Sequence, residues 1–182
     1  MPCPAVGLEY TALICEGEEH MKLYTAVETI PQNCEVSVFL AGGITNCPNW
    51  QKEVIDGLSD MDITVLNPRR ENFPIHDPNA SNEQIKWEFD ALESASIFSM
   101  YFADADSDQP ICMYELGRNL MRMQMRFPKD WKKRIVITAD PKYRRYNDVV
   151  IQTGLATDNA ITIYNTLDEH IEAIKKCCKS LS

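Results

Sequence analysis

The chain has 182 residues, of which 45% are hydrophobic, and this is enough for one domain with a substantial core. Its formal net charge of -9 argues against binding to nucleic acid and to an anionic membrane surface, because both depend on clustered Lys and Arg. No run reaches the roughly 18 apolar residues that a membrane-spanning helix needs.

The cysteines and histidines argue against disulfides and metals. The seven cysteines are an odd number without a CxxC pair, which is typical of reduced thiols, so we expect a cytoplasmic protein. His20, His76 and His170 are far apart in sequence, which disfavours a zinc site. A GxGxxG pattern is missing as well, so we expect neither a dinucleotide nor any other cofactor.

From residue 36 onward, strand-like and helix-like segments alternate, as in parallel βαβ units. The first 34 residues do not follow this alternation, although residues 10–14 and 21–28 are candidates for short elements. We expect residues 1–34 to form an N-terminal extension that packs on an edge of a domain spanning residues 35–182. In chain order, hydrophobic periodicity then predicts a strand at 36–41, a helix at 48–58, a strand at 63–66, a proline-rich loop at 69–79, a helix capped by Ser81, a strand at 97–102, a helix from Pro110 to Met125, strands at 135–138 and 161–164, and a helix at 167–179.

Five such strands with right-handed helical crossovers make a doubly wound parallel sheet with helices on both faces. Ligands of such sheets bind beyond the carboxyl ends of the strands. Several polar residues and glycines follow the predicted strands directly, and we expect them near a ligand: Gly42, Gly43, Asn67, Arg69, Asp104, Asp106, Asp108, Asn147 and Asp148.

Two glutamates on neighbouring predicted helices are candidates for the chemistry. Glu115 lies among Met113, Tyr114 and Leu116, where an idle carboxylate would carry a heavy desolvation cost, so we interpret it as a nucleophile. Glu88 lies on the helix before the third predicted strand. Two carboxyls about 5 Å apart at one edge of a sheet suit retaining glycosyl chemistry, with one attacking and the other handling the proton of the leaving group.

Four segments of the chain resemble the nucleoside 2-deoxyribosyltransferases and the related deoxynucleotide N-hydrolases. They are residues 38–44 (VFLAGGI), 84–88 (QIKWE), 97–102 (IFSMYF) and 114–117 (YELG). The resemblance extends from residue 36 to about residue 164. It implies a flavodoxin-like enzyme in which Glu115 attacks C1′ of a 2′-deoxynucleoside and forms a deoxyribosyl-enzyme intermediate, which a free nucleobase then resolves.

The resemblance also implies roles for other residues. The acid of the family, usually an Asp, falls on Glu88, and a second aspartate that places the sugar and base falls on Asp108 or, as the alternative, on Gln109. Phe39 stands where many members have Tyr. Asn147 is the nearest match to an Asn that a neighbouring subunit contributes, so the resemblance implies a homo-oligomer.

Other interpretations remain open at this stage. Water in place of the second nucleobase would make the protein a deoxynucleoside or deoxynucleoside 5′-monophosphate N-glycosidase, with Arg69 holding the phosphate bidentately. A second alternative is a module that binds a nucleoside or nucleotide but catalyses no reaction. Glu115 alone also fits a carboxylate that interacts with a helix macrodipole, and Asp104, Asp106 and Asp108 partly match a calcium loop.

Overall fold

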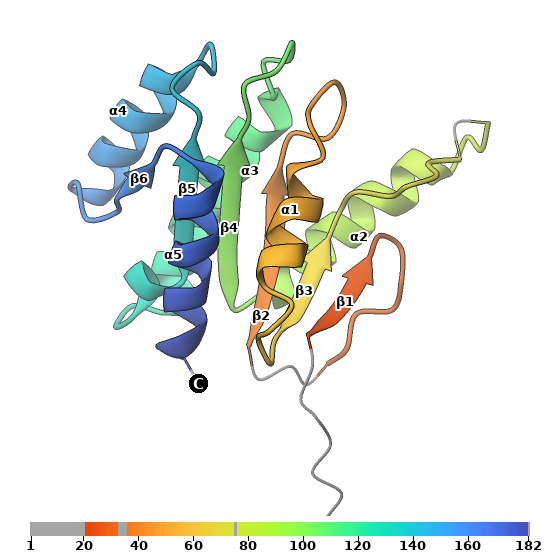
Figure 1. The fold of residues 1–182 in the computed structure, drawn as a ribbon, viewed down its shortest axis with the longest axis horizontal. Helices are drawn as coiled ribbons and strands as arrows, with labels where there is room; N and C mark the ends of the chain where they lie inside the picture. Colours follow the sequence, from red (N-terminus) through yellow and green to blue (C-terminus); the bar gives the residue numbers. More distant parts are fainter. Residues whose placement is uncertain (1–20, 33–35, 75, 182) are drawn as a thin grey trace, which may run out of the picture.

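The computed structural model describes residues 21–32, 36–74 and 76–181. Within them, parallel strands form one six-stranded sheet in the order β1-β3-β2-β4-β5-β6 (Figure 1). From β2 onward this is the flavodoxin-like order, which confirms the predicted fold class. The strands are β1 (Lys22–Thr25), β2 (Ser37–Gly42), β3 (Thr64–Asn67), β4 (Ile97–Phe102), β5 (Ile135–Ala139) and β6 (Ile163–Tyr164).

Helices cover both faces of the sheet, as Figure 1 shows. On β2, Val38 and Leu40 pack in one core with Trp50, whereas Phe39 lies in the other core with Leu116, because successive strand residues point to opposite faces. The first core lies under α1 and α5, and the second lies under α2, α3 and α4. The helices are α1 (Trp50–Gly57), α2 (Ala80–Ser94), α3 (Pro110–Arg126), α4 (Tyr146–Thr157) and α5 (Leu167–Lys179), with a short 3-10 helix at Trp131–Lys133.

The sixth strand comes from the N-terminal region. Only five strands were predicted from residue 36 onward, and β1 adds an edge strand by pairing in parallel with β3 from Lys22↔Thr64 to Thr25↔Asn67. It lies within the short element expected at residues 21–28. The candidate strand at residues 10–14 lies outside the described residues.

Most helix boundaries agree with the sequence pattern, but one predicted cap was wrong and one helix was missed. Pro110 begins α3, as predicted, and α5 has the expected bounds. Ser81 is not the cap of α2: the helix begins one residue earlier, at the fully buried Ala80, and Asn79 is its N-cap. Helix α4 was not expected at all.

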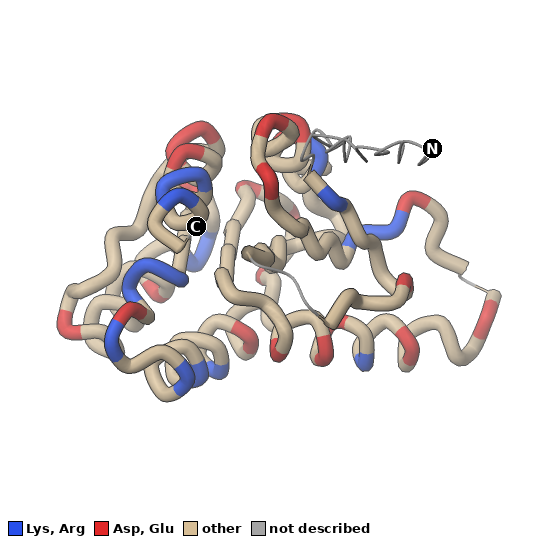
Figure 2. Tube along the Cα trace, turned by 90° about the horizontal axis from the view of Figure 1, so that it is seen from below, with Lys and Arg blue, Asp and Glu red and all other residues tan. Residues whose placement is uncertain are grey.

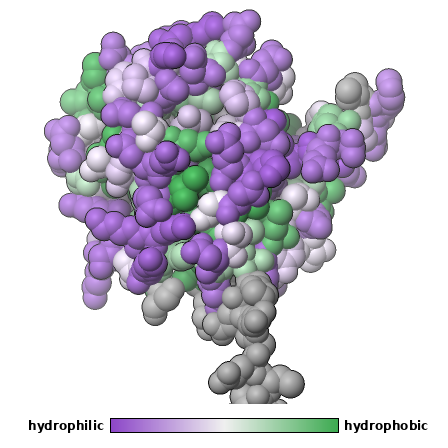
Figure 3. Space-filling model, in the orientation of Figure 1, coloured by the Kyte–Doolittle hydropathy of each residue, from purple (hydrophilic) through white to green (hydrophobic). Residues whose placement is uncertain are grey.

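The outer surface is largely polar. Figure 3 shows the face covered by α1 and α5, where hydrophilic side chains dominate and smaller hydrophobic areas lie between them. In the described part of the chain, every helix is too short or too polar to cross a membrane.

Candidate active site

A cleft of about 220 Å³ opens at the carboxyl end of β2, between α2 and α3. This is the edge of the sheet where a doubly wound fold binds its ligands. The lining residues come from β2 and the loop after it, the residue after β3, α2, the loop between β4 and α3, and the start of α3: Phe39, Ala41, Gly42, Gly43, Ile44, Thr45, Pro68, Glu88, Ser107, Gln109, Pro110, Ile111, Cys112 and Glu115.

The two glycines let β2 turn close to its neighbours. Gly42 has a φ of 151°, which side chains rarely adopt, and a Cβ there would overlap the indole of Trp50. A Cβ on Gly43 would lie only 2.7 Å from Oε1 of Gln109. The indole Nε1 of Trp50 donates to the Gly43 carbonyl at 3.1 Å and fixes the turn.

Glu88 from α2 and Glu115 from α3 face the same cleft, as the sequence analysis expected. Burial and the negative charge of Glu88 together raise the pKa of Glu115 to about 7, although Arg118 opposes this rise. Burial also raises the pKa of Glu88. The cleft therefore holds two carboxyls whose pKa values are both raised by burial, and the charge of Glu88 further disfavours the ionised form of Glu115.

Gln84, one turn before Glu88 on α2, fixes the Glu88 carboxyl. Its Nε2 donates to Glu88 Oε1 at 2.8 Å and to the Pro68 carbonyl at 2.5 Å. Because an N–H donor favours the ionised carboxylate, this hydrogen bond lowers the pKa of Glu88 and offsets part of the effect of burial.

Of the two neighbours proposed to place the substrate, Gln109 lines the cleft and Asp108 does not. Gln109 adopts a left-handed φ of 47° and is only 4% exposed. Its Nε2 donates to the Ala103 carbonyl at 2.9 Å, while its Oε1 has no hydrogen-bond partner. Asp108 is exposed, and its carboxylate lies 3.4 Å from Nη1 of Arg144.

Arg69 does not reach the cleft. Its Nε donates to Gln51 Oε1 at 2.9 Å, and its Nη2 lies within 3.2 Å of the backbone carbonyls of Ile44, Cys47 and Pro48. Asn67 is also outside the cleft lining, and its Oδ1 accepts from the Arg69 backbone N–H at 3.0 Å. In the structure these two residues therefore support the loop after β2.

The remaining candidates divide between the cleft and the surface. Phe39 lines the cleft from β2, and its ring packs 6.4 Å from that of Trp87. Asn147 is exposed on α4 and does not line the cleft of its own chain. Asp106 pairs with Arg144 at 2.9 Å, and the described residues contain no group of three His, Cys, Asp or Glu side chains arranged to hold a metal ion.

Cys112 and Ser107 also line the cleft, and neither was among the site residues expected from the sequence. Cys112 lies three residues before Glu115 on α3, and that helical spacing was the signal that could have found it. Burial raises the pKa of the Cys112 thiol to about 12, so the thiol is neutral and forms part of the cleft wall. Ser107 had no comparable signal because it lies in an irregular loop.

The chain was compared with models of protein families and with curated proteins. The model of the nucleoside 2-deoxyribosyltransferase-like family matches residues 35–128, slightly more than half of the chain. No curated protein matches the chain. Every residue that lines the cleft lies within the matched range.

Proposed function

The chain belongs to the nucleoside 2-deoxyribosyltransferase-like family, and from this premise we propose that it transfers 2-deoxyribose from one nucleobase to another by double displacement through Glu115. One observation carries the proposal. Two carboxyls on different helices face one cleft, and the charge of one raises the pKa of the other. Such a pair suits a retaining reaction at a sugar carbon.

In the first step, an oxygen of Glu115 forms a bond with C1′ while the C1′–N bond to the base breaks. The electron pair of that bond goes to the base nitrogen, which also takes a proton from Glu88, so the base departs neutral. In the second step, a nitrogen of another base attacks C1′, the ester bond to Glu115 breaks, and Glu88 takes the proton back. The missing 2′-hydroxyl makes the oxocarbenium-like transition state easier to reach.

This mechanism requires Glu115 to be ionised and Glu88 to be protonated when the donor base leaves. Burial raises the pKa of both groups, which favours keeping a proton in the cleft, but the pKa of about 7 of Glu115 beside a negative Glu88 places that proton on Glu115 before substrate binds. The hydrogen bond from Gln84 works against a proton on Glu88, so the two roles need a direct test. A donor whose leaving group needs no proton should restore sugar release in Glu88→Gln but not in Glu115→Gln.

The charge of the cleft favours a nucleoside over a 5′-monophosphate. Its lining includes two glutamates and, among the described residues, neither Lys nor Arg. Arg69, the candidate phosphate ligand, is engaged with Gln51 and loop carbonyls. We therefore expect a higher kcat/KM for a deoxynucleoside than for its 5′-monophosphate.

The unpartnered acceptor of Gln109 supports a role in holding the substrate. A buried carbonyl oxygen without a donor is costly, and a ligand that supplies an N–H or O–H removes this cost. A sugar hydroxyl or a base N–H of the substrate is such a donor. This favours Gln109 over Asp108 as the residue that places the substrate.

The proposal is tested by incubating the protein with one deoxynucleoside and a different free nucleobase. Formation of the second deoxynucleoside supports transfer, whereas release of free deoxyribose identifies an N-glycosidase that uses water. Tight nucleoside binding without release of base identifies a binding module instead. Glu115→Gln serves as the control and should form neither product.

We also propose that the protein assembles as a homo-oligomer through α2 and α3. These helices expose an apolar surface next to the cleft, formed by Ile85, Phe89, Ile111, Tyr114, Met121 and Met125. Acidic residues recur along α2, as Figure 2 shows, and within one chain α2 already faces the basic residues of α3, where Arg118 pairs with Glu93. A second copy related by a two-fold axis can bury the exposed apolar surface of these helices against its own.

A further inference from the structure

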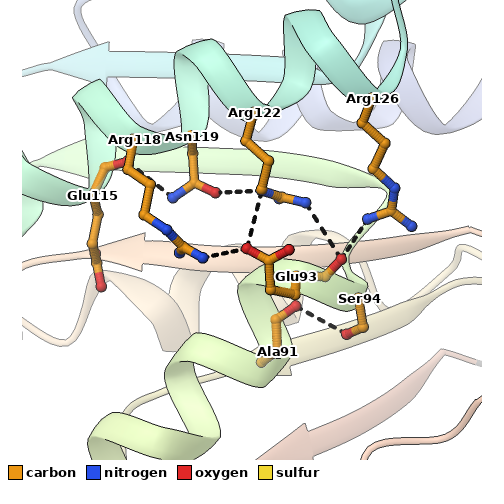
Figure 4. A network of polar contacts seen from close by, with 8 residues as sticks. All are labelled: Ala91, Glu93, Ser94, Glu115, Arg118, Asn119, Arg122 and Arg126. Atoms are coloured by element: carbon orange, nitrogen blue, oxygen red, sulfur yellow. Dashed lines mark hydrogen bonds and ion pairs between the residues drawn. The ribbon is translucent and has the colours of Figure 1, made fainter.

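Arg118 lies one helical turn beyond Glu115 on α3. Residues three apart on a helix are neighbours on one side of it. In Figure 4 both side chains leave α3 on the same side and extend towards α2. Arg118 thus carries its positive charge on the same side of α3 as the carboxyl that the proposed reaction uses as its nucleophile.

Two residues of α2 hold the Arg118 side chain in place. Its Nη2 forms an ion pair with the carboxylate of Glu93, and its guanidinium carbon lies 4.3 Å from the centre of the Phe89 ring. The side chain is only 23% exposed. These contacts fix where the positive charge of Arg118 lies relative to the cleft.

The charged groups near Glu115 act in opposite directions. Glu88 on α2 disfavours the ionised form of Glu115, and Cys112 on α3 is a neutral thiol. Arg118 favours the ionised form. Arg122 and Arg126 lie farther along α3, where both donate to the backbone carbonyl of Glu93.

We propose that Arg118 is a positioning residue for the reaction inferred above: its charge, held by Glu93 and Phe89, favours the ionised form of Glu115 that attacks C1′. The inference rests on the proposed role of Glu115 as the nucleophile. Without a cation beside it, burial and the charge of Glu88 leave Glu115 protonated over more of the neutral range, and a protonated carboxyl is a poor nucleophile.

The test follows the titration of the Glu115 carboxyl carbon by NMR in the wild type, Arg118→Gln and Arg118→Lys. We expect the midpoint in Arg118→Gln to rise by on the order of half to one pH unit, and the Lys variant to stay near the wild type. The acid limb of kcat/KM should move with it, so that activity at pH 6 falls about three- to tenfold and converges with the wild type at pH 9.

Arg126→Gln is the matched control. Arg126 also donates to the Glu93 carbonyl, but it is exposed and lies two turns beyond Arg118, so its removal should leave the Glu115 midpoint unchanged. If Arg118→Gln does not fold, Arg118→Met removes the charge while keeping a long side chain over Phe89.

The proposal is overturned if the Glu115 titration midpoint is unchanged in whichever of these two neutral variants folds. It is also overturned if Arg126→Gln shifts that midpoint by the same amount. Because the NMR titration needs no turnover, an inactive wild type would count against the proposed function and not against the effect of Arg118.

Discussion

Glu115 is held in the cleft at a cost to folding stability. Its pKa is raised to about 7 in the folded chain, whereas a carboxyl in an unfolded chain titrates near 4.3. The folded state therefore holds this proton more tightly, and the resulting stability is present below about pH 4.3 and lost as the pH rises through about 7. We expect Glu115→Gln to unfold at higher urea concentration than the wild type at pH 8, by on the order of 1–2 kcal/mol after allowance for partial exposure.

The same comparison at pH 4 should show little difference, because both chains then carry a neutral group at position 115. A Gln variant that is less stable than the wild type at pH 8 would contradict the electrostatic cost assigned to Glu115. It would indicate instead that the carboxylate makes a stabilising contact in the folded chain.

Gln109 and Asp108 are expected to differ in their contribution to substrate binding. Gln109→Met removes the unpartnered Oε1 while keeping a similar volume, and the loss of one substrate hydrogen bond should lower kcat/KM about tenfold. Asp108→Asn is the adjacent control, and it should change kcat/KM little because Asp108 pairs with Arg144. The opposite ranking of the two variants in a steady-state assay would return the substrate-placing role to Asp108.

The sequence was sufficient to predict the carboxyl pair but not to choose between Asp108 and Gln109. The apolar neighbours of Glu115, and the places of Glu88 and Glu115 on the helices before and after the third predicted strand, predicted a carboxyl pair, and both residues line the cleft. The choice between Asp108 and Gln109 depended on a left-handed φ at one loop residue, which a sequence pattern does not determine. The guanidinium of Arg69 donates to carbonyls of a loop some 20 residues away in sequence, and so it is not free to bind a phosphate. Sequence spacing does not reveal such contacts.

Among the helices, α5 holds a buried histidine against the sheet. His170 is fully buried, with its ring nitrogens 2.8 Å from Ser99 Oγ on β4 and 2.9 Å from Thr138 Oγ1 on β5. Burial lowers its pKa to about 3, so the folded chain keeps it neutral while the unfolded chain takes up a proton below about pH 6.5. Folding stability is therefore lost as the pH falls below about 6.5.

In the wild type, Glu115 opposes the loss of stability caused by His170. The folded chain binds a proton at Glu115 between about pH 7 and 4.5, and this stabilises the folded state as the pH falls. The Glu115→Gln variant lacks this opposing effect. Between pH 6 and pH 5, its free energy of unfolding should fall by roughly 1 kcal/mol more than that of the wild type, as measured by urea denaturation. Parallel stability curves, or a His170 ring that titrates near pH 6.5 in the folded protein, would rule out this account.

The elements were predictable where local signals agreed. Pro110 at the start of α3 and the capping box of Thr166 and Glu169 at the start of α5 are local devices that mark helix ends in the sequence. Helix α4 was missed because Val, Ile, Thr and Gly, which favour helices weakly, make up much of it. Strand β1 is only four residues long, and its pairing with β3 is a tertiary contact.

For the whole molecule, the exposed apolar surface of α2 and α3 predicts self-association. Met125 is 75% exposed on α3, so Met125→Glu should shift the protein towards the monomer in light scattering or sedimentation by placing a charge in the interface. Leu155→Glu is the matched control, because Leu155 is 74% exposed on α4 and lies outside the proposed interface. A monomeric wild type would contradict the assembly, and dissociation by the Leu155 variant alone would move the interface to α4.

The architecture followed from the alternation of strands and helices, because right-handed crossovers leave few arrangements for a parallel sheet. The place of the cleft followed from the same rule, since ligands of such sheets lie beyond the carboxyl ends of the strands. Assembly depends on surface residues instead, and an exposed Met on a helix looks the same in sequence whether it faces solvent or a partner. The methionines of α3 illustrate this: Met123 is buried, while Met121 and Met125 are exposed.

The most direct test of the central claim is to quench the reaction of the protein with a 2′-deoxynucleoside, without acceptor base, and to map the peptides by mass spectrometry. The mechanism predicts one deoxyribosyl group attached to Glu115 in the wild type and none in Glu115→Gln. Release of nucleobase without an adduct at Glu115, or with the sugar on a different residue, would show that Glu115 is not the nucleophile.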